Sequence, residues 1–99
     1  MMTLIFDKTN FNWRDDKEYN LLFISMEQEY LDYKLNGYGY LYENQIYESL
    51  GITWDPSKEN KLYTKEDYRH IILHQTHVRA GDTYTGTVII DVEFRKHFN

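Results

Sequence analysis

Residues 70–94, HIILHQTHVRAGDTYTGTVIIDVEF, are the most strand-like part of the chain. Apolar and polar residues alternate along TVIIDVEF, which is the pattern of a strand with two different faces. One face would carry Val88, Ile90, Val92 and Phe94, and the other Thr87, Ile89, Asp91 and Glu93. AGDT supplies a tight turn, and HIILHQTHV is rich in β-branched residues. We therefore expect a C-terminal β-hairpin whose first strand runs from about His70 to Val78.

The segment before this hairpin is ambiguous between helix and strand. Thr64, with Asp67 three residues later, resembles a helix capping box. Residues 65–77 are therefore compatible with a helix, whereas the β-branched residues of HIILHQTHV favour a strand. We expect one helical turn after Thr64, followed by the strand.

A long helix is predicted to begin after Asp15 or Asp16 and to end at Gly37. Either aspartate can cap the free N–H groups, and Glu18 lies in the first turn, where the helix dipole favours negative charge. Apolar residues recur at spacings of three and four, and we expect this stripe to pack: Tyr19, Leu22, Phe23, Met26, Tyr30 and Tyr33. The opposite side would be wet and acidic, with Glu18, Ser25, Glu29 and Asp32.

A second helix is predicted between Asn44, which is placed to cap it, and Gly51, which ends it. Ile46 and Leu50 would share its apolar face, and residues 3–6 can form a short strand. The predicted fold class is α+β. One long and one short helix pack on a small antiparallel sheet with a C-terminal β-hairpin, all in a single domain spanning residues 1–99.

Charge and composition narrow the classes of partner. The formal net charge is −5, with ten acids and four bases in residues 1–55 and six acids and seven bases in residues 56–99. Apart from Arg95-Lys96 there is no cluster of basic residues, so we expect no direct binding of nucleic acid. An acidic, tyrosine-rich surface suits a basic protein surface instead. No apolar run approaches the roughly 20 residues that cross a bilayer, and the absence of cysteine suits a reducing cytoplasm.

Residues 31–51, LDYKLNGYGYLYENQIYESLG, resemble a family of small uncharacterised proteins encoded by phages and prophages of low-GC Gram-positive bacteria. The pattern of that family runs roughly Leu-Asn-x-x-Leu-x-x-x-Gly-Tyr-x-Phe-Leu-Asn-Asp-Val-Tyr-Asp-x-Leu-Gly. The matching residues are Leu31, Leu35, Gly39, Tyr40, Asn44, Tyr47, Leu50 and Gly51, with conservative matches at Tyr42, Ile46 and Glu48. Glu43 and Gln45 depart from the pattern.

The resemblance implies an origin rather than an activity, because the family has no established catalytic residues. Small acidic phage proteins often act by occupying a host protein. We therefore expect a non-enzymatic inhibitor of a host protein, such as a CRISPR effector or another antiviral-defence component, in the cytoplasm of the host bacterium. The expected partner-binding residues are Glu18, Glu29, Asp32, Tyr33, Tyr38 and Glu43. The alternative is a phage structural or assembly protein that forms a homo-oligomer through its tyrosine-rich faces.

Three histidines in the spacing H-x3-H-x2-H, His70, His74 and His77, raise the alternative of a metal-dependent enzyme. A two-residue turn at Gly81-Asp82 would set His70 opposite Glu93 and His74 opposite Ile89, with Asp91 between them on the same face. Two histidines and two carboxylates would then converge on a divalent ion. The ordinary interpretation is a polar outer face with mild His–Glu pairs, and on that interpretation we expect no catalytic residue, metal or cofactor.

Overall fold

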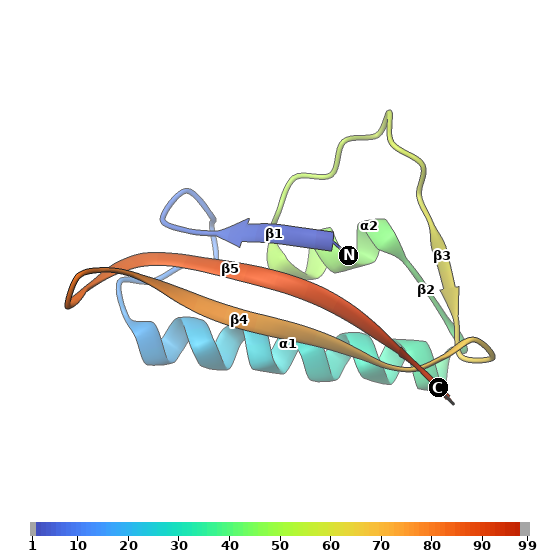
Figure 1. Ribbon diagram of the computed structural model, residues 1–99. Coiled ribbons are helices and arrows are strands. Elements are labelled where there is room, and N and C mark those ends of the chain that lie inside the picture. The colour runs from blue at the N-terminus through green and yellow to red at the C-terminus, as the bar shows by residue number, and fades with distance from the viewer. Residues whose placement is uncertain (1, 98–99) are drawn as a thin grey trace.

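The expected C-terminal hairpin is present and is longer than predicted. The computed structural model describes residues 2–97. Strands β4 (Tyr68–Ala80) and β5 (Thr83–Lys96) pair antiparallel across the turn that contains Gly81. Strand β1 (Met2–Phe6) pairs antiparallel with the other side of β5, which gives the order β1-β5-β4 (Figure 1). The predicted hairpin and N-terminal strand are both confirmed.

Two helices and a second, two-stranded sheet complete the fold. Helix α1 (Lys17–Gly37) is long and helix α2 (Glu43–Leu50) is short. Strand β2 (Tyr40–Tyr42) lies between them in the sequence and pairs with strand β3 (Leu62–Thr64). The predicted α+β class, with one long and one short helix and antiparallel pairing, is therefore confirmed. In the part of the chain that the structure describes, neither helix has the length and apolar character needed to span a membrane.

The two helices begin in different ways. The carboxylate of Asp16 accepts a hydrogen bond from the N–H of Tyr19 at 3.1 Å, as predicted for the cap of α1. Helix α2 begins directly after Tyr42, whose N–H donates to the side-chain oxygen of Gln45 at 2.7 Å. The prediction that Asn44 caps α2 is therefore wrong, because Asn44 already lies inside the helix.

The core lies between the helices and one face of the β1-β5-β4 sheet. Alternate residues of β5 point into it, as the sequence pattern predicted, while those between them face outward. The fully or almost fully buried apolar residues include Leu4 and Phe6 from β1, Ile24, Leu31 and Leu35 from α1, Ile46 and Leu50 from α2, and Val88, Ile90 and Val92 from β5. The other face of the sheet carries no helix among residues 2–97 (Figure 1).

The predicted helical turn after Thr64 is wrong, and so is the helical alternative for residues 65–77. Lys65 to Asp67 form a tight turn that leads directly into β4. Within this turn the N–H of Asp67 donates to the carbonyl of Thr64 at 3.2 Å, and the Thr64 hydroxyl donates to Asp67 at 3.3 Å. The same residue pair that caps a helix thus closes a turn here, because pairing with β5 holds the next residues extended.

The hairpin register also differs from the prediction. His70 pairs with Arg95 rather than with Glu93, and His74 pairs with Asp91 rather than with Ile89. The cause is an irregularity near the turn, since Arg79 pairs with Tyr84 but His77 pairs with Val88. The extra residues lie in β5, and the resulting shift of two positions leaves every side chain on its predicted face.

Gly86 makes this bulge possible. Its φ is 86°, a value that L side chains rarely adopt. The indole Nε1 of Trp13 donates to the Gly86 carbonyl at 2.7 Å, and the Trp13 ring lies where a side chain at position 86 would project. The bulge therefore anchors the loop that precedes α1 to the far end of the hairpin.

We expect Gly86→Ala to lower the free energy of unfolding more than Gly81→Ala. Both glycines have positive φ, so each substitution costs about 1–2 kcal/mol of backbone strain. A Cβ at Gly86 would lie 2.8 Å from the Trp13 ring and would add roughly 1–3 kcal/mol of overpacking, whereas Gly81 has open space around it. Urea denaturation measures both variants, and equal effects would contradict the role assigned to Trp13.

The prediction of which side of α1 packs is wrong. The side chains of α1 buried in the core are Asn20, Ile24, Leu31 and Leu35. Of the stripe predicted to pack, only Phe23 reaches the core, where its ring stacks on Phe6 at 5.6 Å between centroids. Asn20 is tolerated in the interior because its amide donates to the Arg14 carbonyl and its oxygen accepts the Arg14 N–H.

Polar side chains of α1 explain its orientation. The N–H of Ile71 donates to the carboxylate of Asp32 at 3.1 Å, and the N–H of Leu73 donates to the side-chain oxygen of Gln28 at 2.7 Å. The amide of Gln75 donates to the Leu21 carbonyl at 3.2 Å. Helix α1 therefore covers the outer edge of β4 and provides acceptors for its unpaired backbone N–H groups.

Candidate protein-binding surface

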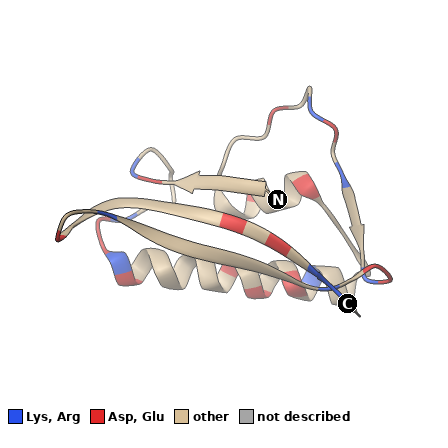
Figure 2. Ribbon diagram, in the orientation of Figure 1, with Lys and Arg blue, Asp and Glu red and all other residues tan. Residues whose placement is uncertain are grey.

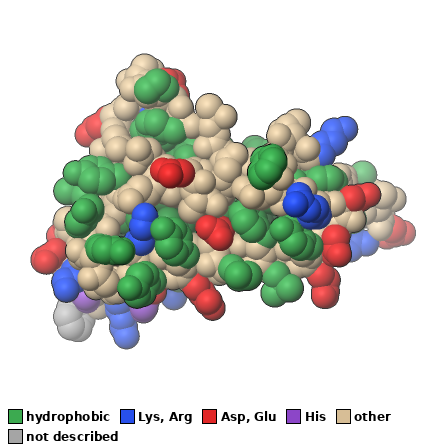
Figure 3. All heavy atoms as spheres, turned by 180° about the vertical axis from the view of Figure 1, so that it is seen from behind, with side chains coloured by type: hydrophobic (Ala, Val, Ile, Leu, Met, Phe, Trp, Pro, Cys, Tyr) green, Lys and Arg blue, Asp and Glu red, His purple; other side chains and the backbone are tan. Residues whose placement is uncertain are grey.

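Helix α1 exposes a row of large apolar side chains on the side opposite the core. Leu22 is 56% exposed, Met26 65% and Tyr33 64%. We define the tyrosine stripe as Tyr19, Leu22, Met26, Tyr30 and Tyr33 of α1 together with Tyr38 and Tyr40, which follow it. Figure 3 views this side of the molecule and shows hydrophobic side chains gathered over it. The stripe predicted to pack is therefore the side that faces solvent.

The tyrosines of the stripe are arranged by contacts with one another and with nearby cations. Tyr33 and Tyr38 meet edge to face with ring centroids 6.2 Å apart. The ammonium of Lys34 lies 5.1 Å from the centre of the Tyr30 ring, and the Arg14 guanidinium lies 5.5 Å from that of Tyr19. At exposed sites each contact of this kind favours one ring orientation by about 0.5–1 kcal/mol. A surface whose rings are already oriented loses less entropy when a partner binds.

Two of the predicted acidic residues lie beside this stripe. Glu18 and Glu29 are exposed on α1, and among residues 2–97 neither carboxylate lies within ion-pair distance of a cation. Tyr33 and Tyr38, also predicted for the site, are 64% and 66% exposed on the same surface. The structure thus brings four of the six predicted residues to one side of the molecule.

The other two predicted residues lie elsewhere. Asp32 is only partly exposed, and its carboxylate accepts the N–H of Ile71 and the ring N–H of His70, the latter at 3.2 Å. It therefore holds α1 against β4 and has little capacity left for a partner. Glu43 begins α2 and lines a cavity between the two sheets.

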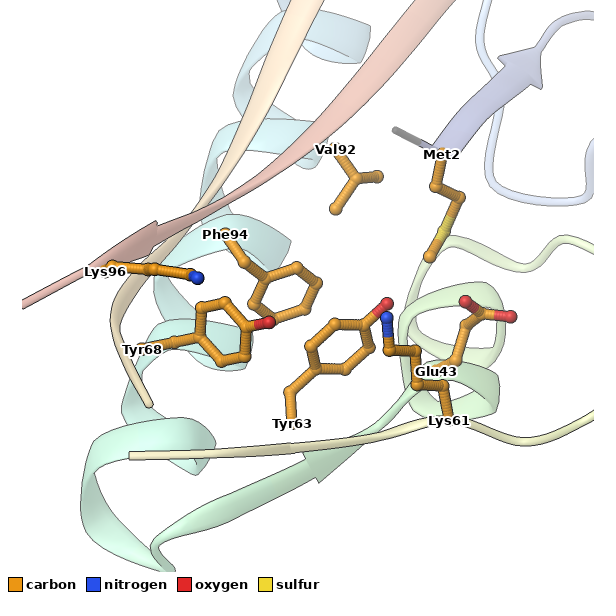
Figure 4. Close-up of a pocket in the computed structure, with 8 residues that line it drawn as sticks. All are labelled: Met2, Glu43, Lys61, Tyr63, Tyr68, Val92, Phe94 and Lys96. Atoms are coloured by element: carbon orange, nitrogen blue, oxygen red, sulfur yellow. The ribbon is translucent and has the colours of Figure 1, made fainter. Parts of the chain in front are cut away.

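This cavity has a volume of about 560 Å³ (Figure 4). Its lining combines three aromatic rings with three charged and two apolar side chains: Tyr63, Tyr68, Phe94, Glu43, Lys61, Lys96, Met2 and Val92. Tyr63 of β3 stacks on Phe94 of β5 with centroids 3.7 Å apart, and Tyr68 meets both rings. The Tyr63 hydroxyl is turned toward Lys61 and Glu43. The stacked rings join the small β2-β3 sheet to the end of the main hairpin. We therefore assign them a structural role.

The predicted histidine cluster is divided among separate contacts. His70 pairs with Asp32, as described above, while His74 Nε2 lies 2.6 Å from Glu93. Hydrogen bonds from His74 and then from Arg95 hold the pKa of Glu93 below its usual range. Asp91 accepts a hydrogen bond from the Thr3 hydroxyl at 2.7 Å. Within residues 2–97, no three side chains of the types His, Cys, Asp or Glu form a group that could hold a metal ion.

Comparison with protein-family models, with curated proteins and with solved structures found no match to this chain. The residues that carry the resemblance to the phage family have visible structural roles. Leu31, Leu35 and Leu50 are buried, and Gly39 and Gly51 have φ values of 92° and 74°. That pattern describes how α1, β2 and α2 fold together and does not itself define the exposed stripe.

A matched pair of leucines tests which side of α1 is buried. We expect Leu31→Ala to lower the free energy of unfolding by about 2–5 kcal/mol, because Leu31 is fully buried. Leu22→Ala should lower it by less than about 0.5 kcal/mol, because that side chain is exposed. Urea denaturation of both variants gives the comparison. A larger loss at Leu22 would mean that the predicted stripe packs after all.

The surroundings of Tyr63 in this cavity lead to a prediction about stability at alkaline pH. Burial, followed by the negative charge of Glu43, raises the pKa of Tyr63 to about 12 from an ordinary value of 10.0. The unfolded chain ionises first, so the stability from neutral Tyr63 is fully present below pH 10.0 and is lost as the pH rises toward about 12. A titration followed by tyrosinate absorbance, read directly after each rapid pH jump, should show a step near pH 12. Tyr63→Phe should remove this step. Identical titrations would contradict this assignment.

Proposed function

We propose that this chain is a non-enzymatic protein that binds and inhibits a host protein through the tyrosine stripe. The observation that carries the proposal is the exposure of so many large apolar side chains on one helix whose opposite side already packs into the core. Contiguous exposed apolar surface is costly in water and in soluble proteins commonly marks an interaction site. Tyrosine and methionine are also enriched where proteins meet.

The negative charge of this chain supports a partner whose binding site is basic. Residues 1–55 carry a net charge of −6 (four bases minus ten acids), and Figure 2 shows acids along α1. Glu18 and Glu29 flank the stripe without cations of their own among the described residues. A protein surface that normally holds nucleic acid has the complementary charge, and the carboxylates would stand in for phosphates.

The resemblance of residues 31–51 to phage proteins supports a host protein as the target. Occupying the nucleic-acid groove of an antiviral-defence component, such as a CRISPR effector, would block it by steric exclusion and charge. This mechanism needs no catalytic residue in the inhibitor. It also assigns the tyrosine stripe to affinity and the carboxylates to steering and specificity.

A charge-reversal pair tests the proposal. Tagged wild-type chain should recover one host protein near stoichiometry from a nuclease-treated lysate of a Gram-positive host. We expect Glu18→Lys with Glu29→Lys to raise the dissociation constant of that complex by about tenfold or more. The matched control reverses two exposed acids outside α1, Glu59→Lys with Glu66→Lys, and should bind like wild type. Asp32 is left unchanged because it bonds β4.

Either of two results would contradict the proposal. Equal binding by both charge-reversed variants would show that the acids beside the stripe do not meet the partner. Recovery of the bait alone, with a homo-oligomer that Met26→Lys disrupts, would assign the stripe to self-association within a phage particle. Native mass spectrometry of the purified chain distinguishes that second case.

A further inference from the structure

The two outer edges of the β1-β5-β4 sheet are treated differently. At β4, acceptors from α1 satisfy the N–H groups of Ile71 and Leu73. At β1, no backbone hydrogen bond joins the strand to any described residue outside β5. A strand paired on one side leaves alternate N–H and C=O groups pointing away from its neighbour. Those of β1 therefore have only water, or another strand, as a partner.

The composition of β1 offers no protection against pairing. Its sequence, MTLIF, contains no charged residue, proline or glycine, and Figure 2 shows this strand free of charge. Natural sheets usually guard an edge with lysine, proline, a bulge or a covering segment. Ile5 is 50% exposed on the outer face and lies opposite Ile89 of β5. The exposed apolar side chain of Ile5 thus lies beside the edge of β1.

We propose that β1 pairs antiparallel with β1 of a second copy of this chain, which gives one continuous six-stranded sheet about a two-fold axis. Only an extended strand offers donors and acceptors at the spacing that this edge presents. Pairing centred on Leu4 sets Thr3 against Ile5 across the axis, so both copies use the same residues. It brings no charges together within the strands, and it sets the Thr3 side chain of the second copy beside the exposed Ile5.

This dimer goes beyond the proposed function because it uses a different part of the molecule. Helix α1 lies along β4, at the opposite edge of the sheet from β1 (Figure 1). Both tyrosine stripes therefore stay exposed in the dimer. Two identical binding surfaces on one particle give avidity toward a partner that is itself multivalent.

Light scattering coupled to size-exclusion chromatography tests the dimer with purified protein between about 10 and about 500 µM. Wild type should shift from monomer to dimer over this range. Ile5→Lys places a charge on the open edge and should raise the dimer dissociation constant by at least about tenfold. Thr76→Lys is the matched control, because Thr76 is exposed on the same outer face but lies on β4. It should dimerise like wild type.

Circular dichroism checks that each variant is folded, and Thr3→Lys gives a second charged edge if Ile5→Lys is not. In wild type, alternate β1 amides should also exchange hydrogen more slowly as the concentration rises. A chain that stays monomeric throughout the range would overturn the proposal. A dimer that both edge variants retain would also overturn it, and so would protection of β1 amides by a host protein alone. The tyrosine stripe is unchanged in all of these variants. A result that overturns the dimer therefore does not contradict the proposed function.

Discussion

The hydrogen bonds from the backbone of β4 to Asp32 and Gln28 of α1 are the constraint on which the rest of this structure depends. The edge of a sheet must satisfy its free N–H groups, and here two side chains of a helix do so at 3.1 and 2.7 Å. These contacts fix the rotation of α1 about its own axis. Once Asp32 and Gln28 face β4, Ile24, Leu31 and Leu35 turn into the core. Leu22, Met26 and Tyr33 are then left in solvent. The candidate binding surface is thus a consequence of how the sheet edge is closed.

The same arrangement separates the molecule into parts with different roles. The β4 edge is covered by α1, the β1 edge has no backbone partner within residues 2–97, and the bulge at Gly86 joins the hairpin to the loop before α1 through Trp13. The acidic residues divide accordingly, because Asp32 bonds β4 and Glu43 lines the cavity between the sheets, while Glu18 and Glu29 are exposed at the surface. A carboxylate's place in the sequence therefore says little about its availability to a partner. What matters is whether an unpaired backbone N–H or another side chain lies within its reach.

Much of the fold could be predicted from the sequence because its signals are local. Alternation along β5 predicts the strand and its inward face, and the turn at Gly81-Asp82 predicts the hairpin. The pair Asp15-Asp16 predicts the start of α1, and the structure shows that Asp16 is the cap. The predictions that fail concern features that are set by contacts between residues far apart in the sequence. The predicted orientation of α1 is wrong because apolar residues occur on several sides of this helix. The side that packs is set by Asp32 and Gln28, which accept hydrogen bonds from β4. The predicted register of the hairpin is wrong because a bulge at Gly86 shifts it by two positions. This bulge is held by Trp13, which lies 73 residues from Gly86 in the sequence. A glycine within a strand pattern was the available signal for that bulge. Four of the six predicted site residues, two tyrosines and two acids, lie on one surface, and their binding to a partner stays a prediction.

Amide hydrogen exchange at Ile71 and Leu73, followed by NMR on the free protein, tests the central claim most directly. If α1 closes the β4 edge as described, both amides should be protected and should exchange only when the whole domain unfolds, like amides bonded between β4 and β5. Exchange as fast as that of an open strand edge would contradict the account. In that case α1 would not be held in this rotation, and the exposure of the tyrosine stripe would lose its physical basis.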